Sequence, residues 1–414
     1  MSSIINATTT NGLKLQPDNS GSLVLQTNNG TTAVTVDTSQ NTTLAGKLTT
    51  ASSGIQFSDS SIQTAAASPY VLKNRIINGD MRIDQRNAGA SVTPSDSQYL
   101  VDRWVFYRTQ ASKFTAQQNA GSVTPPAGFT NYLGFTSSSA YSVLSTDVFI
   151  VTQPIEGFNV SDLAFGTASA KTVTLSFWVR SSLTGTFGGS LYNIANNKSY
   201  TYSYTISAAN TWEQKSITIT GDTVTALATG NTGGISTYFN LGAGSNWQAT
   251  AGTWTTGNYT TPSGTVNVVG TNGATWYITG VQLEIGTSAT PFERRLYNQE
   301  LVNCQRYCQV INSTTNQFGN GWFNATNIIM FLVNIPITMR TAPTLTWNGG
   351  TISYDIPGTT ITSTGTSGTL PYPNIFGTNG GRLAIQLSTA TQTSGSQAMV
   401  YIEGTGKLTL SSEL

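Results

Sequence analysis

Charged side chains are distributed very unevenly along this chain. Residues 223–283 contain no Asp, Glu, Lys or Arg, whereas residues 73–108 contain ten of them in 36 positions. Only 9% of the 414 residues are charged, against about 25% in ordinary globular proteins. The chain still has 16 Phe, 17 Tyr and 8 Trp residues that can build cores, so disorder explains the composition poorly. This combination indicates β-structure with uncharged surfaces of Thr, Ser and Asn.

The same composition argues against several classes of function. The formal net charge is +1, so no basic field is available to hold nucleic acid. The chain has no histidine, which removes the commonest general base and most zinc and iron sites. We therefore expect no catalytic residue, no metal and no other cofactor. Residues 1–6 lack the features of a secretory signal, and the apolar run 328–333 is too short to span a bilayer, so membrane insertion is not expected.

Short alternating segments dominate residues 1–70. Apolar and polar residues alternate in 12–16, 21–26, 32–36 and 44–48, with polar turns between them. One copy has too few apolar side chains for a core, and repeats of this kind become stable when neighbouring units or chains supply the missing apolar face. We expect a trimeric fibrous segment here, with a flexible tail as the alternative.

An antiparallel β-sandwich is predicted for residues 71–296. In residues 172–179 the apolar side chains fall on one face of a strand, and Thr, Ser and Trp178 fall on the other. This is the pattern of a sheet with one buried face. Further strands are predicted at 148–153, 199–206, 212–220 and 274–284. Eight to ten strands over about 225 residues suit a jelly roll.

A charged, helix-favouring stretch follows the predicted sandwich. Apolar residues between Leu296 and Cys308 recur at helical spacing, so we predict a helical connector over 297–312. Residues 313–414 return to a β pattern and are expected to form a small separate domain. Cys304 would share one helix face with Cys308, and we expect two buried thiols there rather than a disulfide or a metal site.

The dense charges of residues 73–108 need an explanation in so charge-poor a chain. Each acid has an arginine within a few positions, and arginine suits forked pairing with carboxylates. We expect paired networks rather than a catalytic carboxylate dyad. The residues concerned are Arg75, Arg82, Arg86 and Arg103 with Asp80, Asp84 and Asp102.

Several phrases resemble those of bacteriophage tail-fibre and receptor-binding proteins. Residues 53–67 are similar to the phrase that closes the fibrous shaft in many of these proteins, with Ser60 where glycine is commoner. The other phrases are Asn-Gly-Asp-Met (78–81) with Gln-Arg (85–86), Asp-Arg-Trp (102–104), Leu-Ser-Phe-Trp-Val-Arg (175–180), Thr-Trp-Glu (211–213), Gly-Val-Gln-Leu-Glu (280–284), Ala-Thr-Pro-Phe-Glu (289–293) and Glu-Leu-Val-Asn-Cys-Gln-Arg-Tyr (300–307). Cys308 departs from the pattern, which usually has an aromatic residue there.

The resemblance implies a jelly roll similar to carbohydrate-binding modules on a fibrous N-terminal stem. It implies a non-enzymatic homotrimer in the phage tail, which contacts other tail or baseplate proteins through residues 1–70 and binds a host-surface glycan or lipopolysaccharide. A head, collar or baseplate adaptor that binds only virion proteins is the alternative. A polysaccharide depolymerase or a secreted carbohydrate-binding adhesin fits less well.

Aromatic side chains in charge-free stretches are the candidates for sugar binding. Sugar rings stack on aromatic faces within a frame of amide and hydroxyl groups. Residues 246–259 combine three aromatic residues with such a frame, although each ring could instead plug an edge of the sandwich. In the C-terminal domain most aromatic residues are expected in the core. The candidates are Trp247, Trp254, Tyr259, Trp322, Trp347 and Tyr372.

Overall fold

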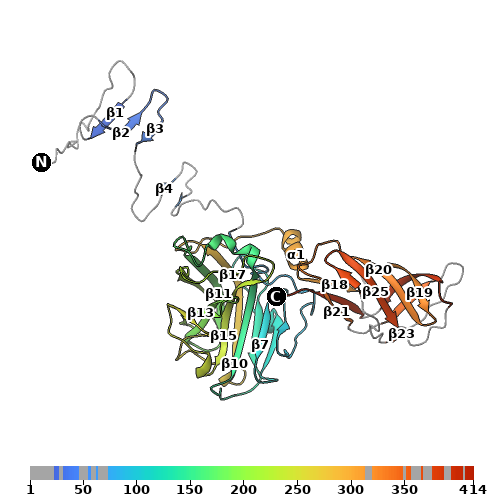
Figure 1. Ribbon diagram of the computed structural model, residues 1–414. Coiled ribbons are helices and arrows are strands. Elements are labelled where there is room, and N and C mark those ends of the chain that lie inside the picture. The colour runs from blue at the N-terminus through green and yellow to red at the C-terminus, as the bar shows by residue number, and fades with distance from the viewer. Residues whose placement is uncertain are drawn as a thin grey trace. The chain divides into compact units, whose positions relative to one another are not determined.

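The computed structural model of the chain (Figure 1) has two compact units, Met1–Val71 and Leu72–Leu414. It describes residues 23–27, 31–45, 55–56, 62–63, 73–312, 319–347, 351–355, 365–366, 375–386, 393–403 and 406–414. In these residues the fold is all-β with one short α-helix, as the sequence predicts. The predicted C-terminal domain belongs to the same compact unit as the predicted sandwich.

The first unit contains short antiparallel strands. Strands β1, β2 and β3 form one sheet, and β4 pairs with β5. Their bounds are Leu23–Thr27, Thr31–Val36, Thr42–Leu44, Ile55–Gln56 and Ile62–Gln63. Val24, Leu25 and Leu44 keep 43%, 47% and 41% of their surface exposed in the single chain, so these strands leave apolar side chains uncovered. The strand predicted at 12–16 and the phrase around Ser60 lie outside the described residues.

The second unit begins with a sandwich of two antiparallel sheets, which hold seven and five strands, more than the eight to ten predicted. The seven-stranded sheet has the order β16 (Trp254–Thr256), β13 (Lys198–Ile206), β12 (Gly185–Asn193), β15 (Gly233–Ala243), β10 (Val148–Glu156), β7 (Val105–Arg108) and β6 (Gln98–Tyr99). The five-stranded sheet has the order β14 (Glu213–Ile219), β11 (Val173–Ser181), β17 (Thr275–Ile285), β9 (Leu133–Ser137) and β8 (Phe114–Gln118). Short 3-10 turns connect them: η1 (Ala120–Ser122), η2 (Gly157–Asn159), η3 (Ser161–Leu163), η4 (Ser245–Trp247) and η5 (Val268–Gly270).

Aromatic rings fill the space between the two sheets. The ring of Phe177 on β11 meets the rings of Tyr204 and Phe239 edge-on, with centroids 5.0 Å away in both cases. Such edge-to-face pairs add about 0.5–1.5 kcal/mol each beyond the area they bury. Trp104 and Trp276 are fully buried beside them. The apolar face predicted for 172–179 is confirmed, because Val173, Leu175, Phe177 and Val179 are inaccessible. The opposite face is not open to solvent as expected, since Thr174 and Ser176 are buried too.

Glycine lets the two central strands β12 and β15 approach their neighbours closely. A Cβ added at Gly189 would lie 2.2 Å from the carbonyl oxygen of Tyr238 and 2.4 Å from the hydroxyl oxygen of Tyr202, so no other residue fits there without a shift. Glycine within a strand commonly marks such a close backbone approach. The glycine-rich composition of both strands explains why alternation alone did not predict them.

The predicted helix over 297–312 is shorter in the structure. Helix α1 spans Tyr297–Gln305, and the chain turns directly into strand β18 (Cys308–Asn312). Strand β18 pairs with β27 (Lys407–Ser411), about a hundred residues later in the chain. The helical prediction for 306–312 is therefore wrong, because a long-range strand pairing that local spacing cannot reveal determines the conformation there. Leu296, predicted to be on the apolar face, is 79% exposed.

The rest of the second unit, called the tip here (residues 308–412), packs two further sheets against each other. One has the order β18, β27, β21 (Thr344–Trp347). The other has the order β23 (Gly365–Thr366), β22 (Thr351–Asp355), β26 (Gln397–Glu403), β19 (Gly319–Ala325), β20 (Ile328–Asn334), β25 (Gly380–Gln386) and β24 (Ile375–Gly377). Phe323, Phe331 and Val400 of the larger sheet pack in one core with Leu408 and Leu410 of β27.

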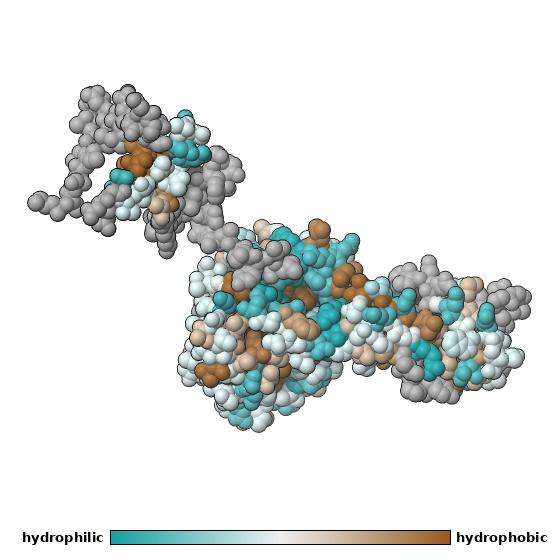
Figure 2. All heavy atoms as spheres, turned by 45° about the horizontal axis from the view of Figure 1, so that its top comes forward, coloured by the Kyte–Doolittle hydropathy of each residue, from teal (hydrophilic) through white to brown (hydrophobic). Residues whose placement is uncertain are grey.

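One face of the second unit is mostly of intermediate hydropathy (Figure 2). Figure 2 shows much of this face in pale colours, with apolar and strongly polar residues in small groups. Hydroxyl-bearing and aromatic residues have this intermediate hydropathy, so the surface matches the charge-poor composition. A scan of the described residues found no helix long and apolar enough to cross a membrane.

Candidate functional site

A cavity of about 470 Å³ opens on the outer face of the seven-stranded sandwich sheet. Strands β7, β10, β15 and β12 lie side by side there. Alternation along each strand places one set of side chains in the core and the other on this outer face. The outer set includes the aromatic rings of Tyr107, Tyr192 and Tyr238, which line the cavity, and Trp247 completes the cavity wall from the turn η4. We call this cavity the aromatic groove.

The rings of the aromatic groove are held in place by packing and by hydrogen bonds, among them one from the Tyr192 hydroxyl to Asn197 Oδ1 at 3.2 Å. Tyr192 on β12 stacks on Tyr238 of β15, with centroids 5.4 Å apart and an interplanar angle of 30°. Val148 and Ile150 of β10 form an apolar cluster with Tyr238. The indole Nε1 of Trp247 donates to the carbonyl oxygen of Thr146 at 2.9 Å, which fixes the orientation of that ring. The groove is therefore preformed in the folded chain.

Two polar atoms in the wall of the groove have no partner within the described residues. Thr152 Oγ1 and Asn258 Oδ1 are buried and make no hydrogen bond. A buried polar group without a partner costs about 1–3 kcal/mol, so native structures rarely leave one without a reason. Both atoms lie below the surface of the groove wall. Burial also raises the pKa of the Tyr238 phenol, which keeps it neutral and able to donate or accept.

The groove contains little charge. Among the side chains in its wall, Asp96 and Arg108 are the charged ones. The Asp96 carboxylate accepts the backbone N–H of Arg108 at 2.9 Å, and Arg108 Nε donates to the carbonyl oxygen of Pro94 at 2.8 Å. Asp96 is the acidic side chain among the described residues of this wall, and the Arg108 N–H binds its carboxylate. The chemistry that the wall offers is ring stacking and hydrogen bonding.

Of the three candidates between 246 and 259, Trp247 lies in the aromatic groove. Trp254 instead closes an edge of the sandwich. Its ring meets Phe165 and Tyr200 edge-on at 5.6 Å in both cases, and its Nε1 donates to the carbonyl oxygen of Thr220. The backbone N–H of Tyr259 donates to Ser199, and its side chain is half-buried outside the groove wall.

The three candidates in the tip occupy different environments. Trp322 on β19 is 37% exposed. Trp347 on β21 is partly buried and packs against the tip core, so it has a structural role. Tyr372 lies outside the described residues.

Sequence reasoning missed Tyr107, Tyr192 and Tyr238. The last two lie on the glycine-rich strands that the pattern did not predict. The sequence does contain a strand pattern around Tyr238, because Ile235, Thr237, Phe239 and Leu241 alternate with it. The structure shows that these four residues are inaccessible. The strand β15 therefore carries Tyr238 on its outer face.

All four predicted arginines pair with carboxylates, but of the pairs expected within residues 73–108 only Arg82–Asp80 and Arg86–Asp102 form; Arg75 and Arg103 pair with acids from other parts of the chain. Arg75 pairs with Asp162 at 2.6 Å and Arg82 with Asp80 at 3.3 Å. Asp84 instead accepts backbone N–H groups of Asn87 and Gly89 in a turn. Asp80, Asp84 and Asp102 do not line the aromatic groove, whereas Asp96 of the same stretch does.

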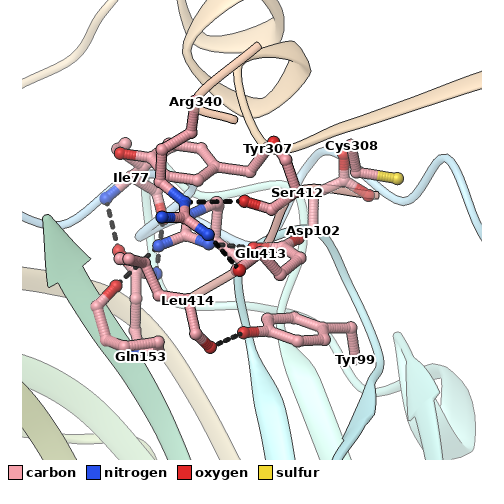
Figure 3. A network of polar contacts seen from close by, with 12 residues as sticks. Ile77, Tyr99, Asp102, Gln153, Tyr307, Cys308, Arg340, Ser412, Glu413 and Leu414 are labelled. Carbon is pink, nitrogen blue, oxygen red and sulfur yellow. Dashed lines mark hydrogen bonds and ion pairs between the residues drawn. The ribbon is translucent and has the colours of Figure 1, made fainter. Parts of the chain in front are cut away.

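The remaining charges join the sandwich to the end of the chain (Figure 3). Fully buried Arg103 pairs with the Glu413 carboxylate, donates to the Pro154 carbonyl oxygen at 2.6 Å and lies over the Tyr307 ring at 3.6 Å. Arg86 pairs with Glu413 at 3.0 Å. We call the whole set the junction network; its members are Arg86, Asp102, Arg103, Glu156, Arg306, Tyr307, Arg340 and Glu413.

Two carboxylates of the junction network have opposite pKa shifts. Burial raises the pKa of Asp102 to about 6, although attraction to Arg86 and hydrogen bonds from Gln85 act against it. Burial also acts to raise the pKa of Glu156, but hydrogen bonds from Arg306 and Tyr307 outweigh it and lower the value. Asp102 has a shifted pKa inside packed protein rather than in the groove, so a structural role explains it.

Cys304 and Cys308 are both buried and free, so the prediction of two buried thiols is confirmed. They do not share a helix face, because Cys304 belongs to α1 and Cys308 begins β18. Burial raises the pKa of both thiols. The described residues contain no group of three or more Cys, Asp and Glu side chains that could hold a metal ion.

Comparisons with known proteins found structural matches only. No family model and no curated protein matches the chain. The enzymatically active domain of tailspike protein 4 from bacteriophage CBA120 matches with 12% identity and a TM-score of 0.30, over 51% of this chain and 21% of that one. The family 11 carbohydrate-binding module from Clostridium thermocellum, in complex with a β-1,3-1,4-mixed-linked tetrasaccharide, matches with 12% identity and a TM-score of 0.25, over 48% of this chain and 98% of that one.

A third match is a carbohydrate-binding module in complex with β-1,4-galactotriose, with 10% identity and a TM-score of 0.26, over 52% of this chain and 100% of that one. This chain thus spans about a fifth of the length of the tailspike domain. These values describe a likeness in β-sandwich architecture. Any functional inference has to rest on the residues of this chain.

Proposed function

We propose that this chain is a structural subunit of a bacteriophage tail fibre and binds a host-surface glycan through the aromatic groove. One observation carries the binding half of this proposal. The aromatic groove combines stacked, preformed aromatic rings with two buried polar atoms that lack partners. The sequence phrases between 53 and 307 that resemble tail-fibre proteins support the other half.

A glycan suits the groove better than an apolar or a strongly charged ligand. Sugar rings present C–H faces that pack on aromatic rings, and their hydroxyl groups both donate and accept hydrogen bonds. Tyr107, Thr109 and Asn258 bring hydroxyl and amide groups to the groove wall, where they can pair with such hydroxyls. The volume of about 470 Å³ lies within the usual range of about 300–1,000 Å³ for small-molecule sites, enough for a few sugar rings.

Binding to purified bacterial surface polysaccharides tests the proposal. The full chain would be titrated against a panel of lipopolysaccharides and capsular polysaccharides, together with Tyr192→Ala and Trp247→Ala. We expect one or more polysaccharides to bind and both substitutions to weaken binding. Phe158→Ala is the matched control, because Phe158 is 60% exposed and lies outside the groove wall. Equal binding by all variants would refute the groove as the site.

The fibre half of the proposal predicts a homotrimer with residues 1–70 as the assembly and attachment segment. The exposed Val24, Leu25 and Leu44 support it, because apolar faces left open by one chain can be covered by two others. Light scattering on the full chain should give three times the 43.8 kDa of one chain. A truncation that begins at Leu72 should lose or weaken the trimer.

The same measurements separate the alternatives. A full-length monomer would contradict the fibre model and favour a secreted binding module. A trimer that binds no polysaccharide, but labels the head, collar or baseplate of virions when an antibody is applied, would favour an adaptor. Release of reducing ends from a bound polysaccharide would identify a depolymerase.

A further inference from the structure

A second hollow, of about 540 Å³, lies on the larger sheet of the tip. Strands β19 and β26 pair there, and alternation turns Phe323 and Val400 into the tip core. The residues that alternate with them, such as Trp322 on β19 and Met399 on β26, therefore face outward. Trp322 is 37% exposed and Met399 is 40% exposed on this outer face, which makes an aromatic ring accessible beside a thioether.

The pairing register places two amide side chains next to the Trp322 ring. Trp322 lies opposite Gln397 on β26, and Asn320 lies opposite Met399. Asn320 and Trp322 are two positions apart on one strand, so their side chains leave the sheet on the same face. The ring is thus flanked by one amide along the strand and another across it. An indole face framed by amides matches a sugar ring, which needs C–H stacking and hydroxyl hydrogen bonds together.

None of the described residues that line this hollow has a charged side chain. It consists of Asn320, Gly321, Trp322, Gly395, Gln397, Ala398 and Met399. A phosphate or carboxylate would find no cation here to offset its loss of water. An uncharged ligand would meet no such penalty.

We infer that the tip has a second saccharide site, centred on Trp322, that takes a neutral sugar unit. The inference shares the ligand class of the proposed function but does not depend on the aromatic groove. Two sites on one chain also raise the apparent affinity for a polymer, because the second contact becomes intramolecular once the first has formed.

Fluorine NMR on the full chain tests this site directly. The chain has eight Trp residues, and 5-fluorotryptophan would label all of them. Trp322→Phe and Trp247→Phe would each remove one signal and so assign it. The probes are neutral oligosaccharides (maltohexaose, cellohexaose, chitohexaose and β-1,4-galactotriose). We expect at least one probe to shift the Trp322 signal in a saturable way, and the shift to persist in Trp247→Phe.

Other outcomes have defined meanings. A shift at Trp247 alone would leave the aromatic groove as a site and overturn this inference. A shift at Trp322 alone would support this inference and count against the groove. No shift at either position with any probe would overturn both for neutral sugars. A Trp322 signal that moves on dilution without sugar would mean that the face contacts a second copy of the chain, which also overturns the inference.

The two amides give a second, independent readout. Gln397→Ala should weaken the binding of the probe that shifts the Trp322 signal by roughly tenfold, or about 1.4 kcal/mol, since one hydrogen bond to the sugar is lost. Met330→Leu is the matched control, because Met330 lies beside Trp322 in the sheet but is buried. Unchanged affinity in Gln397→Ala would overturn the inference of a sugar site framed by amides at Trp322.

Discussion

The aromatic groove and the junction network lie in one compact unit but use opposite chemistry. The groove is open, lined by neutral rings, and leaves two polar atoms without partners. The junction network is closed and charged, and Glu413 meets two arginines within it. The charged residues that stand out in the sequence therefore hold the fold together, while inconspicuous tyrosines form the candidate site. In a charge-poor chain, conspicuous charge indicates architecture rather than chemistry.

The largest expected effect is the loss of a buried charge from the junction network. Arg103→Ala leaves the Glu413 carboxylate without its fully buried partner and removes the hydrogen bond to Pro154. Removing one member of a buried pair costs about 3–5 kcal/mol of unfolding free energy. Denaturant unfolding of the full chain should show this loss, while the glycan affinity of the folded fraction stays unchanged. A loss below about 1 kcal/mol would mean that water reaches the pair.

The next effect concerns pH and the buried Asp102. The pKa of this carboxyl is about 6 in the folded chain and 3.8 as the ordinary value. Between these values the folded state holds a proton that the unfolded state has released, so this group's contribution to stability rises as pH falls. The stability of the wild type relative to Asp102→Asn should increase by up to about 3 kcal/mol from neutral pH to about pH 4. Denaturant unfolding across this range measures the difference.

Glu156 should give the opposite dependence of stability on pH. Its pKa is lowered, so its contribution to stability is present above the ordinary value and lost as pH falls through the lowered one. The stability of the wild type relative to Glu156→Gln should therefore decrease on acidification. Acidification could instead change the stability of the wild type relative to each variant in the same direction. In that case burial would not be the dominant influence on the Asp102 pKa, or hydrogen bonding would not be the dominant influence on the Glu156 pKa.

A smaller effect is expected in the aromatic groove, and it concerns binding. Tyr192→Ala removes the ring stacked on Tyr238, and Trp247→Ala removes the indole at the end of the cavity. Each should weaken polysaccharide binding by at least about tenfold, or about 1.4 kcal/mol. The unfolding free energy should change less than it does in Arg103→Ala, because neither ring is fully buried. A large stability loss with unchanged affinity would reverse the roles of the two regions.

The sequence predicted the all-β fold and the buried apolar face of β11, because these follow from local pattern and composition. It also predicted that the arginines of residues 73–108 pair with carboxylates, but Arg75 and Arg103 find theirs at Asp162 and Glu413, which are distant in sequence. It missed the groove for a specific reason. Tyr192 and Tyr238 lie on strands whose glycines, such as Gly189, permit close approach of a neighbouring strand, and that requirement exists only in three dimensions. It also missed the end of α1 at Gln305, because strand β18 is defined by its pairing with β27. The charge-free, aromatic loop pointed to Trp247, but it pointed equally to Trp254 and Tyr259, which lie outside the groove wall.

The smallest expected effect tests whether burial, and not charge itself, makes the junction network different. Arg75 pairs with Asp162 at 2.6 Å, and the Asp162 side chain is 38% exposed. Arg103, in contrast, is fully buried in its pair with Glu413. Solvent-exposed pairs contribute about 0–1 kcal/mol, because water and salt screen them. Arg75→Ala should therefore cost no more than about 1 kcal/mol in the same denaturant experiment that reports on Arg103→Ala. Its cost should also shrink further at high salt, whereas the cost of Arg103→Ala should not.

Equal costs for the two variants would show that the arginines of residues 73–108 act as one cooperative network. The contrast would then lie between that whole network and the groove, rather than between buried and exposed charge.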